Sequence, residues 1–162
     1  MEAAVQRTFE DAFPELFRVA YRAAHRVTGD AGASEDAASE ALVRAGVRWR
    51  RISGRALPWV VRVATNLAID HTRRAARERR VAPVGGSVDG VESHIDLYRA
   101  LKALPKRQRE VVVLRYFGDL SEREIAAELG MAPGTVKSHA SRGLAALRAA
   151  LEDRPITEEM TR

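Results

Sequence analysis

The chain has 162 residues, of which 27 are Lys or Arg and 22 are Asp or Glu, so its formal net charge is +5 at pH 7. This basic balance favours a polyanionic partner such as nucleic acid or an anionic membrane. The sequence contains no cysteine, which excludes disulfides, thiol catalysis and the usual structural zinc sites. No run approaches the ~20 apolar residues of a membrane helix and the N-terminus lacks signal-peptide features, so we expect a cytoplasmic protein without membrane insertion.

The charge is distributed unevenly along the chain. The stretch from Arg44 to Arg80 contains eleven arginines but only Asp70 and Glu78 as acids, whereas residues 1–43 are acidic on balance. A phosphate backbone suits the basic stretch. These arginines could instead form an ordinary solvated surface, but such surfaces normally mix both signs. We therefore expect the acidic end to contact a protein and the basic stretch to contact DNA.

Apolar residues spaced three and four apart predict three helices in the first half of the chain. The first helix runs from Phe9 to near Gly29. The second follows Ser34, which we interpret as its N-cap. The third begins around Pro58, because proline is tolerated in a first helical turn, and it continues into the basic run RRAARERR.

A flexible linker is predicted over residues 81–95, because VAPVGGSVDGV carries three Gly and one Pro without a helical period. Short helices are predicted over 95–104 and 106–117. No strand pattern competes with the helical ones. The sequence thus predicts an all-α fold of two small helical domains, 9–80 and 96–151.

The segment from Leu120, LSEREIAAELGMAPGTVKSHASRGLAALRAAL, predicts a helix-turn-helix. Ser121 and Glu124 form a capping box that opens a helix of about two turns. Gly130 closes this helix, and Pro133 can occupy the first position of the next one. The spacing matches a motif whose second helix enters the major groove of DNA.

The second helix of this motif is the expected recognition helix. Val136, Leu144 and Leu147 should anchor it inward, and its start offers side chains that bond phosphates or base edges. These are Thr135, Lys137, Ser138, His139, Ser141 and Arg142. A helical hairpin that merely packs is the alternative, and a solitary exposed histidine such as His139 often has no role.

Four ordered blocks resemble extracytoplasmic-function (ECF) sigma factors of bacterial RNA polymerase. They are ELFRVAYRAAHRVTGD, SEDAASEALVRA, PWVVRVATNLAIDHTRR and LPKRQREVVVLRYFGDLSEREIAAELGMAPGTVKSHASRGLAALR. The resemblance implies that 9–80 is region 2, which binds polymerase and melts the minus-ten promoter element. It implies that 96–151 is region 4, which reads the minus-thirty-five element and completes the contact with core polymerase.

The resemblance also implies roles for individual residues. Asp36, Glu40 and Arg44 match the helix that binds the beta-prime clamp helices, while the beta flap is the further polymerase contact of the family. The loop from Arg51 to Leu57 matches the part that captures a flipped base. The implied minus-ten residues are Arg51, Arg55, Asn66, Asp70, Arg73 and Arg74. An anti-sigma factor is an implied partner.

Several positions depart from the family pattern. Ser39 stands where Gln is usual, Leu42 where an aromatic residue is usual, and Gly46 where Trp is usual. In the recognition helix His139 and Leu144 replace common arginines. Promoter sequence therefore does not transfer from relatives.

Two other functions compete with that of a sigma factor. A transcription regulator could bind DNA through the helix-turn-helix without polymerase and use the N-terminal half to dimerise. An enzyme acting on nucleic acid fits poorly, because the sequence has no P-loop and its histidines are scattered. We expect no catalytic residue, no metal and no cofactor.

Overall fold

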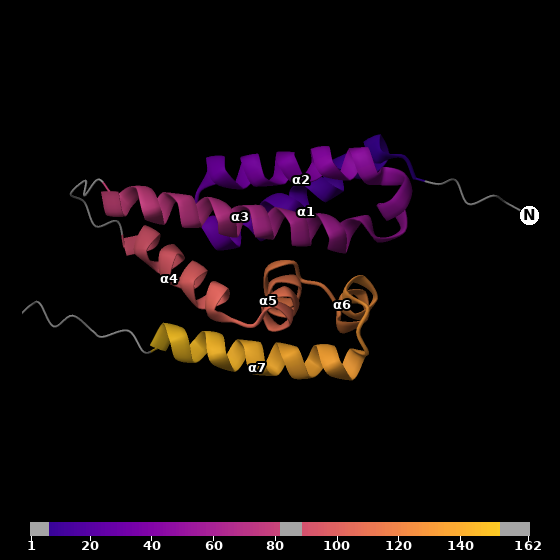
Figure 1. Cartoon of the computed structure of the whole chain (residues 1–162). Helices are drawn as coiled ribbons and strands as arrows, with labels where there is room; N and C mark the ends of the chain where they lie inside the picture. The colour runs from indigo at the N-terminus through magenta and orange to yellow at the C-terminus, as the bar shows by residue number, and fades with distance from the viewer. Residues whose placement is uncertain (1–6, 82–88, 153–162) are drawn as a thin grey trace, which may run out of the picture.

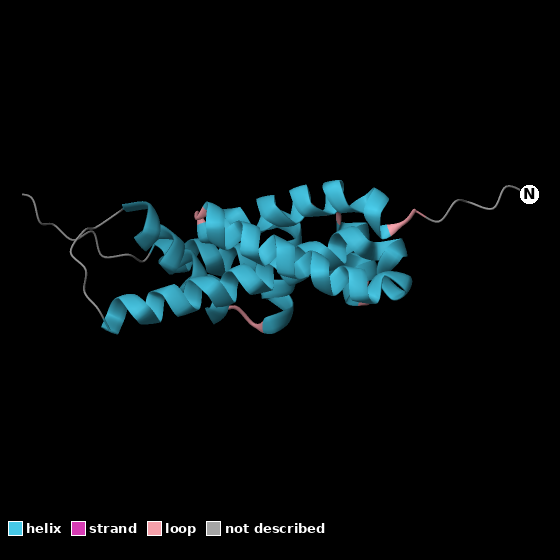
Figure 2. Ribbon diagram, turned by 90° about the horizontal axis from the view of Figure 1, so that it is seen from above, coloured by secondary structure: helices cyan, strands magenta, loops and turns pink. Residues whose placement is uncertain are grey.

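The computed structural model describes residues 7–81 and 89–152, and all regular elements in these ranges are helical (Figures 1 and 2). The first half contains α1 (Phe9–Thr28), α2 (Ala31–Ile52), the 3₁₀ turn η1 (Ser53–Arg55) and α3 (Ala56–Val81). The second half contains α4 (Asp89–Ala103), α5 (Lys106–Val112), the π-helical turn η2 (Val113–Phe117), α6 (Glu122–Leu129) and α7 (Pro133–Glu152). The predicted all-α class is confirmed.

The start of α2 differs from the sequence prediction. Asp30, not Ser34, is the N-cap, and its side chain accepts a hydrogen bond from the Ala33 amide at 2.7 Å. Ser34 is buried in the first turn, where its hydroxyl lies 3.2 Å from His25 Nδ1. The true cap precedes the predicted one by four residues because Gly29 ends α1 in the left-handed conformation, with φ of 64°, and Asp30 follows immediately.

Helices α1, α2 and α3 form a three-helix bundle around a core rich in alanine. Ala20, Ala41 and Ala64 are fully buried where the helices approach one another. Leu42 and Val60 are enclosed beside them, and each such branched side chain stabilises the fold by about 1.5–3 kcal/mol. Leu42 is thus a core residue of the bundle.

Helical structure in the second half begins earlier in the sequence than predicted. Helix α4 begins at Asp89, so the end of the predicted linker 81–95 is helical, while residues 82–88 lie outside the described ranges. The helix predicted over 106–117 becomes π-helical after Val112. Leu101, Leu114 and Val136 are fully buried in this half.

The two helical domains pack against one another, with α4 to α7 lying along the bundle of α1 to α3 (Figure 1). One apolar cluster joins Val27 and Ile69 to Leu101 and Phe117. A second cluster includes Ala23 and Val61 from the bundle and, from the other domain, Leu114, Ile125 and Leu129. Both clusters therefore cross the boundary between the domains.

Candidate nucleic-acid interface

The turn of the helix-turn-helix has the predicted geometry. The Ser121 hydroxyl accepts a hydrogen bond from the Glu124 amide at 3.3 Å, and Glu124 Oε2 accepts one from the Ser121 amide at 2.8 Å. The capping box is confirmed, and α6 ends at Gly130 with φ of 64°. The Ser121 hydroxyl, followed by its backbone amide, lowers the pKa of Glu124, against a smaller opposing effect of burial. The charged carboxylate thus stabilises the helix start.

Helix α7 presents the predicted recognition residues, and α5 and α6 lie between it and α3 (Figure 1). Thr135, Lys137, Ser138, Ser141 and Arg142 are all exposed. Two positions differ from expectation. His139 is half-buried, with Nδ1 enclosed and lacking a hydrogen-bond partner, and Leu144 is only half-buried, so the inward anchors are Val136 and Leu147.

The outward face of α2 carries Asp36, Glu40 and Arg44, all of them exposed. Within this set Glu40 accepts a hydrogen bond from Arg44 at 2.7 Å, one helical turn away. Two valines beside them were not predicted as site residues. Val43 is 64% exposed and Val47 is 82% exposed. Helical periodicity could have indicated their exposure, because Val43 and Val47 lie on a different face of α2 from the buried Ala41 and Ala45.

The segment from Arg51 to Leu57 is not an open loop as predicted. Arg51 belongs to the last turn of α2, Ser53–Arg55 forms η1, and Leu57 lies in the first turn of α3. Helix α3 follows without a break, so the chain turns within three residues. Beside this turn lies a cavity of about 320 Å³. Trp49, Gly54 and Pro58 line it from the bundle, and Glu124 and Glu128 line it from α6.

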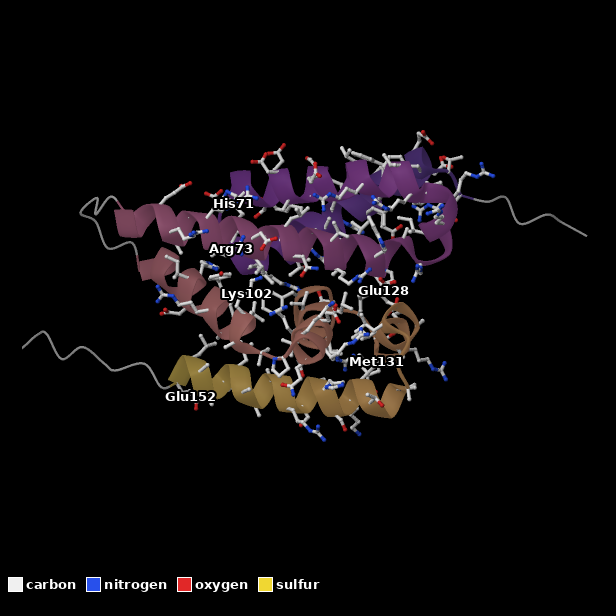
Figure 3. All side chains as sticks on the ribbon, in the orientation of Figure 1. His71, Arg73, Lys102, Glu128, Met131 and Glu152 are labelled. Atoms are coloured by element: carbon white, nitrogen blue, oxygen red, sulfur yellow. The ribbon has the colours of Figure 1, made fainter. Side chains whose placement is uncertain are left out.

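The implied minus-ten residues differ in their surroundings. Arg51, Asn66, Arg73 and Arg74 are exposed. Asp70 lies 3.8 Å from Lys102 Nζ in α4, and Figure 3 shows Lys102 between α4 and α3. Arg55 Nη1 lies 3.5 Å from Glu128 of α6. The structure therefore joins two of these residues to the other domain.

Two further charged residues, which were not predicted as site residues, lie at the same interface between the domains. Arg62 of α3 lies 2.9 Å from Glu128, whose side chain is completely buried. Glu128 lies next to the buried Leu129, at the edge of the apolar stripe of α6. This position was the one indication in the sequence that Glu128 could be buried. Which residue it would meet depends on the packing of the domains, and periodicity carries no information about that.

Among the described residues, no group of three His, Cys, Asp or Glu side chains is placed to hold a metal ion. No helix in the described part of the chain combines the length and the apolar character needed to cross a membrane.

Comparison with protein families identifies both halves of the chain. Residues 13–78 match the model "Sigma-70 region 2", and residues 94–147 match the model "Sigma-70, region 4". These matches follow the order of the two helical domains. They define the class of protein, a sigma factor with regions 2 and 4, and disfavour a helix-turn-helix regulator of another kind.

Curated relatives show to which family of sigma factors the chain belongs. The ECF RNA polymerase sigma factor SigL of Mycobacterium tuberculosis is 36% identical, over 96% of this chain and 94% of the relative. SigW of Bacillus subtilis, also an ECF sigma factor, is 31% identical over 92% and 94% of the two chains. The chain belongs to the ECF family of RNA polymerase sigma factors.

A solved structure supports the fold. Sigma factor RpoE, in its complex with the anti-sigma factor NepR from Bartonella quintana, superposes with a TM-score of 0.54. It covers 90% of this chain and 98% of its own, at 22% sequence identity. This likeness concerns the arrangement of the helices.

Proposed function

We propose that this protein binds core RNA polymerase and directs it to promoters by recognising the minus-ten and minus-thirty-five elements. The observation that carries the proposal is the presence of both sigma regions in chain order, together with an exposed polar start of α7. Lys137 and Arg142 supply positive charge there, and Thr135, Ser138 and Ser141 supply hydroxyls for phosphates or base edges. Its role is to direct the polymerase, with no catalysis of its own.

The polymerase-binding surface that we propose is the outward face of α2. Asp36 and Glu40 provide negative charge, while Val43 and Val47 provide exposed apolar area beside it. Interfaces commonly combine an apolar centre with a polar rim, which matches this arrangement. The beta-prime clamp helices are the proposed partner of this face, with the beta flap contacting region 4.

The minus-ten element is assigned to the end of α2, η1 and α3. Arg51, Asn66, Arg73 and Arg74 present three positive charges and an amide to solvent. A strand opened from a duplex needs cationic side chains for its phosphates and a pocket for an unstacked base. The bundle side of the cavity beside η1, formed by Trp49, Gly54 and Pro58, is the proposed site of that base. An anti-sigma factor that covers these surfaces is proposed as the regulatory partner.

The test is run-off transcription with purified core polymerase on a library of genomic fragments. The protein should produce discrete transcripts that core polymerase alone does not. A variant with Lys137→Ala and Arg142→Ala should lose these transcripts while still co-purifying with polymerase. Binding of DNA without any association with polymerase would overturn the proposal in favour of a regulator that acts alone.

A further inference from the structure

A buried carboxylate joins the two domains. The Glu128 side chain in α6 is 0% exposed. Its Oε1 lies 2.9 Å from Arg62 Nη2 in α3, and its Oε2 lies 3.5 Å from Arg55 Nη1 in η1. Figure 3 shows Glu128 between α6 and the bundle. We call these two ion pairs the Glu128 latch.

We call the packed state of the two domains the closed arrangement. Glu128 is buried and paired only in this arrangement. An ionised carboxylate enclosed in protein is costly unless it is paired. Neither Glu128 oxygen has a hydrogen bond of good geometry, so its partners act mainly through charge. Both arginines belong to the other domain, and they approach the carboxylate only while the domains are packed together.

Other contacts support the closed arrangement away from the latch. Arg26 Nη1 lies 2.8 Å from Asp119, and it also donates to the Phe117 carbonyl at 2.9 Å. Asp119 has a φ of 55°, which is uncommon for a residue other than glycine. His94 Nδ1 lies 3.1 Å from the Val27 carbonyl. The domains thus meet through a packed and specific interface.

The closed arrangement is too compact for a promoter. A compact chain of 162 residues has a radius of gyration of about 15 Å and a diameter of about 40 Å. The two promoter elements lie about 25 base pairs apart, which is about 85 Å at ~3.4 Å per base pair. One closed molecule cannot contact both elements, so the domains must separate before both are engaged.

We propose that the Glu128 carboxylate occupies a phosphate-binding site formed by Arg55 and Arg62, and that it competes there with single-stranded minus-ten DNA. Closure leaves the polar face of α7 exposed but pairs Arg55 and Arg62 within the protein. The closed chain can therefore meet duplex DNA through α7 while its strand-binding site is occupied. The inference rests on the proposed function for its DNA ligand, but not for the closure itself.

The first experiment measures closure without DNA. Because the sequence lacks cysteine, Ser39→Cys and Ala149→Cys at exposed positions of α2 and α7 can carry a dye pair for energy transfer. Glu128→Gln keeps the shape but removes the charge, so it should raise the ratio of open to closed molecules about tenfold or more. Glu152→Gln, at an exposed site on α7, is the charge-matched control and should leave the transfer unchanged. Unchanged transfer in Glu128→Gln would overturn the latch.

The second experiment measures the competition. The probe is a fluorescent, random-sequence single-stranded DNA 15-mer, whose phosphates are independent of promoter sequence. If closure blocks the strand site, the affinity of Glu128→Gln should rise by the same factor as its open fraction. Domain opening with unchanged affinity would overturn the competition. If neither protein binds the probe, the minus-ten assignment fails, and the energy-transfer result still decides whether Glu128 holds the domains together.

A disulfide across the interface makes the opposite change to Glu128→Gln, because it holds the two domains together. A Cβ built at Gly118 lies 3.5 Å from Val61 Cβ, within the range of about 3.5–4.5 Å for disulfides. Val61→Cys removes the Cγ1 methyl, 2.4 Å from that Cβ, but the Leu114 backbone carbonyl at 2.9 Å also has to move, which costs stability. The single-cysteine variants are the controls. If both single-cysteine variants fold normally, failure of the double variant to form the bridge would contradict the closed arrangement.

The oxidised double variant should bind single-stranded DNA about tenfold more weakly than the reduced one. The salt slope of its binding should also fall by about 0.7 for each phosphate that Arg55 and Arg62 can no longer bind. Binding to the duplex form of the same DNA should persist through α7. Equal single-strand binding by the oxidised and reduced proteins would overturn the proposal.

Discussion

The ring of Phe9 packs against the backbone of Gly46, so that a Cβ added at this glycine would lie 3.3 Å from Phe9 Cε1. The same ring meets Trp49 edge-on, with centroids 5.5 Å apart. Gly46 stands where the resemblance leads one to expect Trp. In this chain an aromatic ring from α1 takes the space that a large side chain on α2 would need.

Gly46→Trp should therefore destabilise the bundle by about 1–3 kcal/mol, because the new ring competes with Phe9 for one site. Phe9→Ala should also destabilise it, because the packing of this ring on α2 is removed. In the double variant the two effects should partly cancel, with a coupling of about 0.5–3 kcal/mol. Thermal unfolding of the four proteins measures this. Simple additivity would show that the two side chains do not share the space.

Ser121→Ala should lower the stability of region 4 by about 1 kcal/mol, because it removes the N-cap of α6. The loss should depend on pH. Since the pKa of Glu124 is lowered by the Ser121 hydroxyl, its stabilising effect is present above the ordinary Glu pKa of about 4.3 and is lost as pH falls through the lowered folded value. The gap between the two proteins should thus be largest near neutrality and shrink in acid. Urea unfolding across this range checks it, and a gap that widened in acid would contradict the role of Glu124.

Lys137→Ala and Arg142→Ala should each reduce the magnitude of the salt slope of duplex binding by about 0.9 if the side chain contacts a phosphate. A residue that reads a base edge should instead relax sequence preference, at a cost of about 1–3 kcal/mol for that base. Titrations at several salt concentrations on a promoter fragment separate the two cases. Ala149→Ser, on an exposed part of α7 distant from its start, is the control. If the double variant kept both affinity and preference, α7 would not be the reader.

Charge reversal at Asp36 and Glu40 should weaken co-purification with core polymerase, because both acids lie on the proposed contact face. Val47→Asp should weaken it as well, since an added charge would replace exposed apolar area. Reversal at Glu152, on the other domain, should have little effect. Gel filtration with core polymerase measures the bound fraction, and full binding by all three α2 variants would move the contact to another surface.

Exchange of η1 for an unrelated turn of equal length should impair promoter melting more than initial docking. The reason is that unstacking a base costs a few kcal/mol, which contacts at this turn must return. Permanganate footprinting of unpaired thymines reports melting, and a duplex-binding assay on the holoenzyme reports docking. Normal opening by the exchanged protein, with unchanged minus-ten preference, would show that this turn captures no base.

Local features were predictable because they depend on neighbours in the sequence. The capping box at Ser121, the turn at Gly130 and the helix start at Pro133 each involve groups within a few residues, and all three are present. The N-cap of α2 was misplaced at Ser34 because Ser34 and Asp30 both have cap chemistry. The end of α1 at Gly29 decides between them.

The amino-acid sequence by itself determined the all-α class, the order of the two regions and the polar start of α7, since periodicity and local capping encode these. Only the tertiary structure decided that Glu128 meets Arg55 and Arg62, that Asp70 meets Lys102, and that Val61 packs on Gly118. Each of these contacts joins residues that are far apart in the sequence. They arise because apolar surface left on both domains is buried when the domains pack together, and this packing brings the charged residues at its edge within reach of one another.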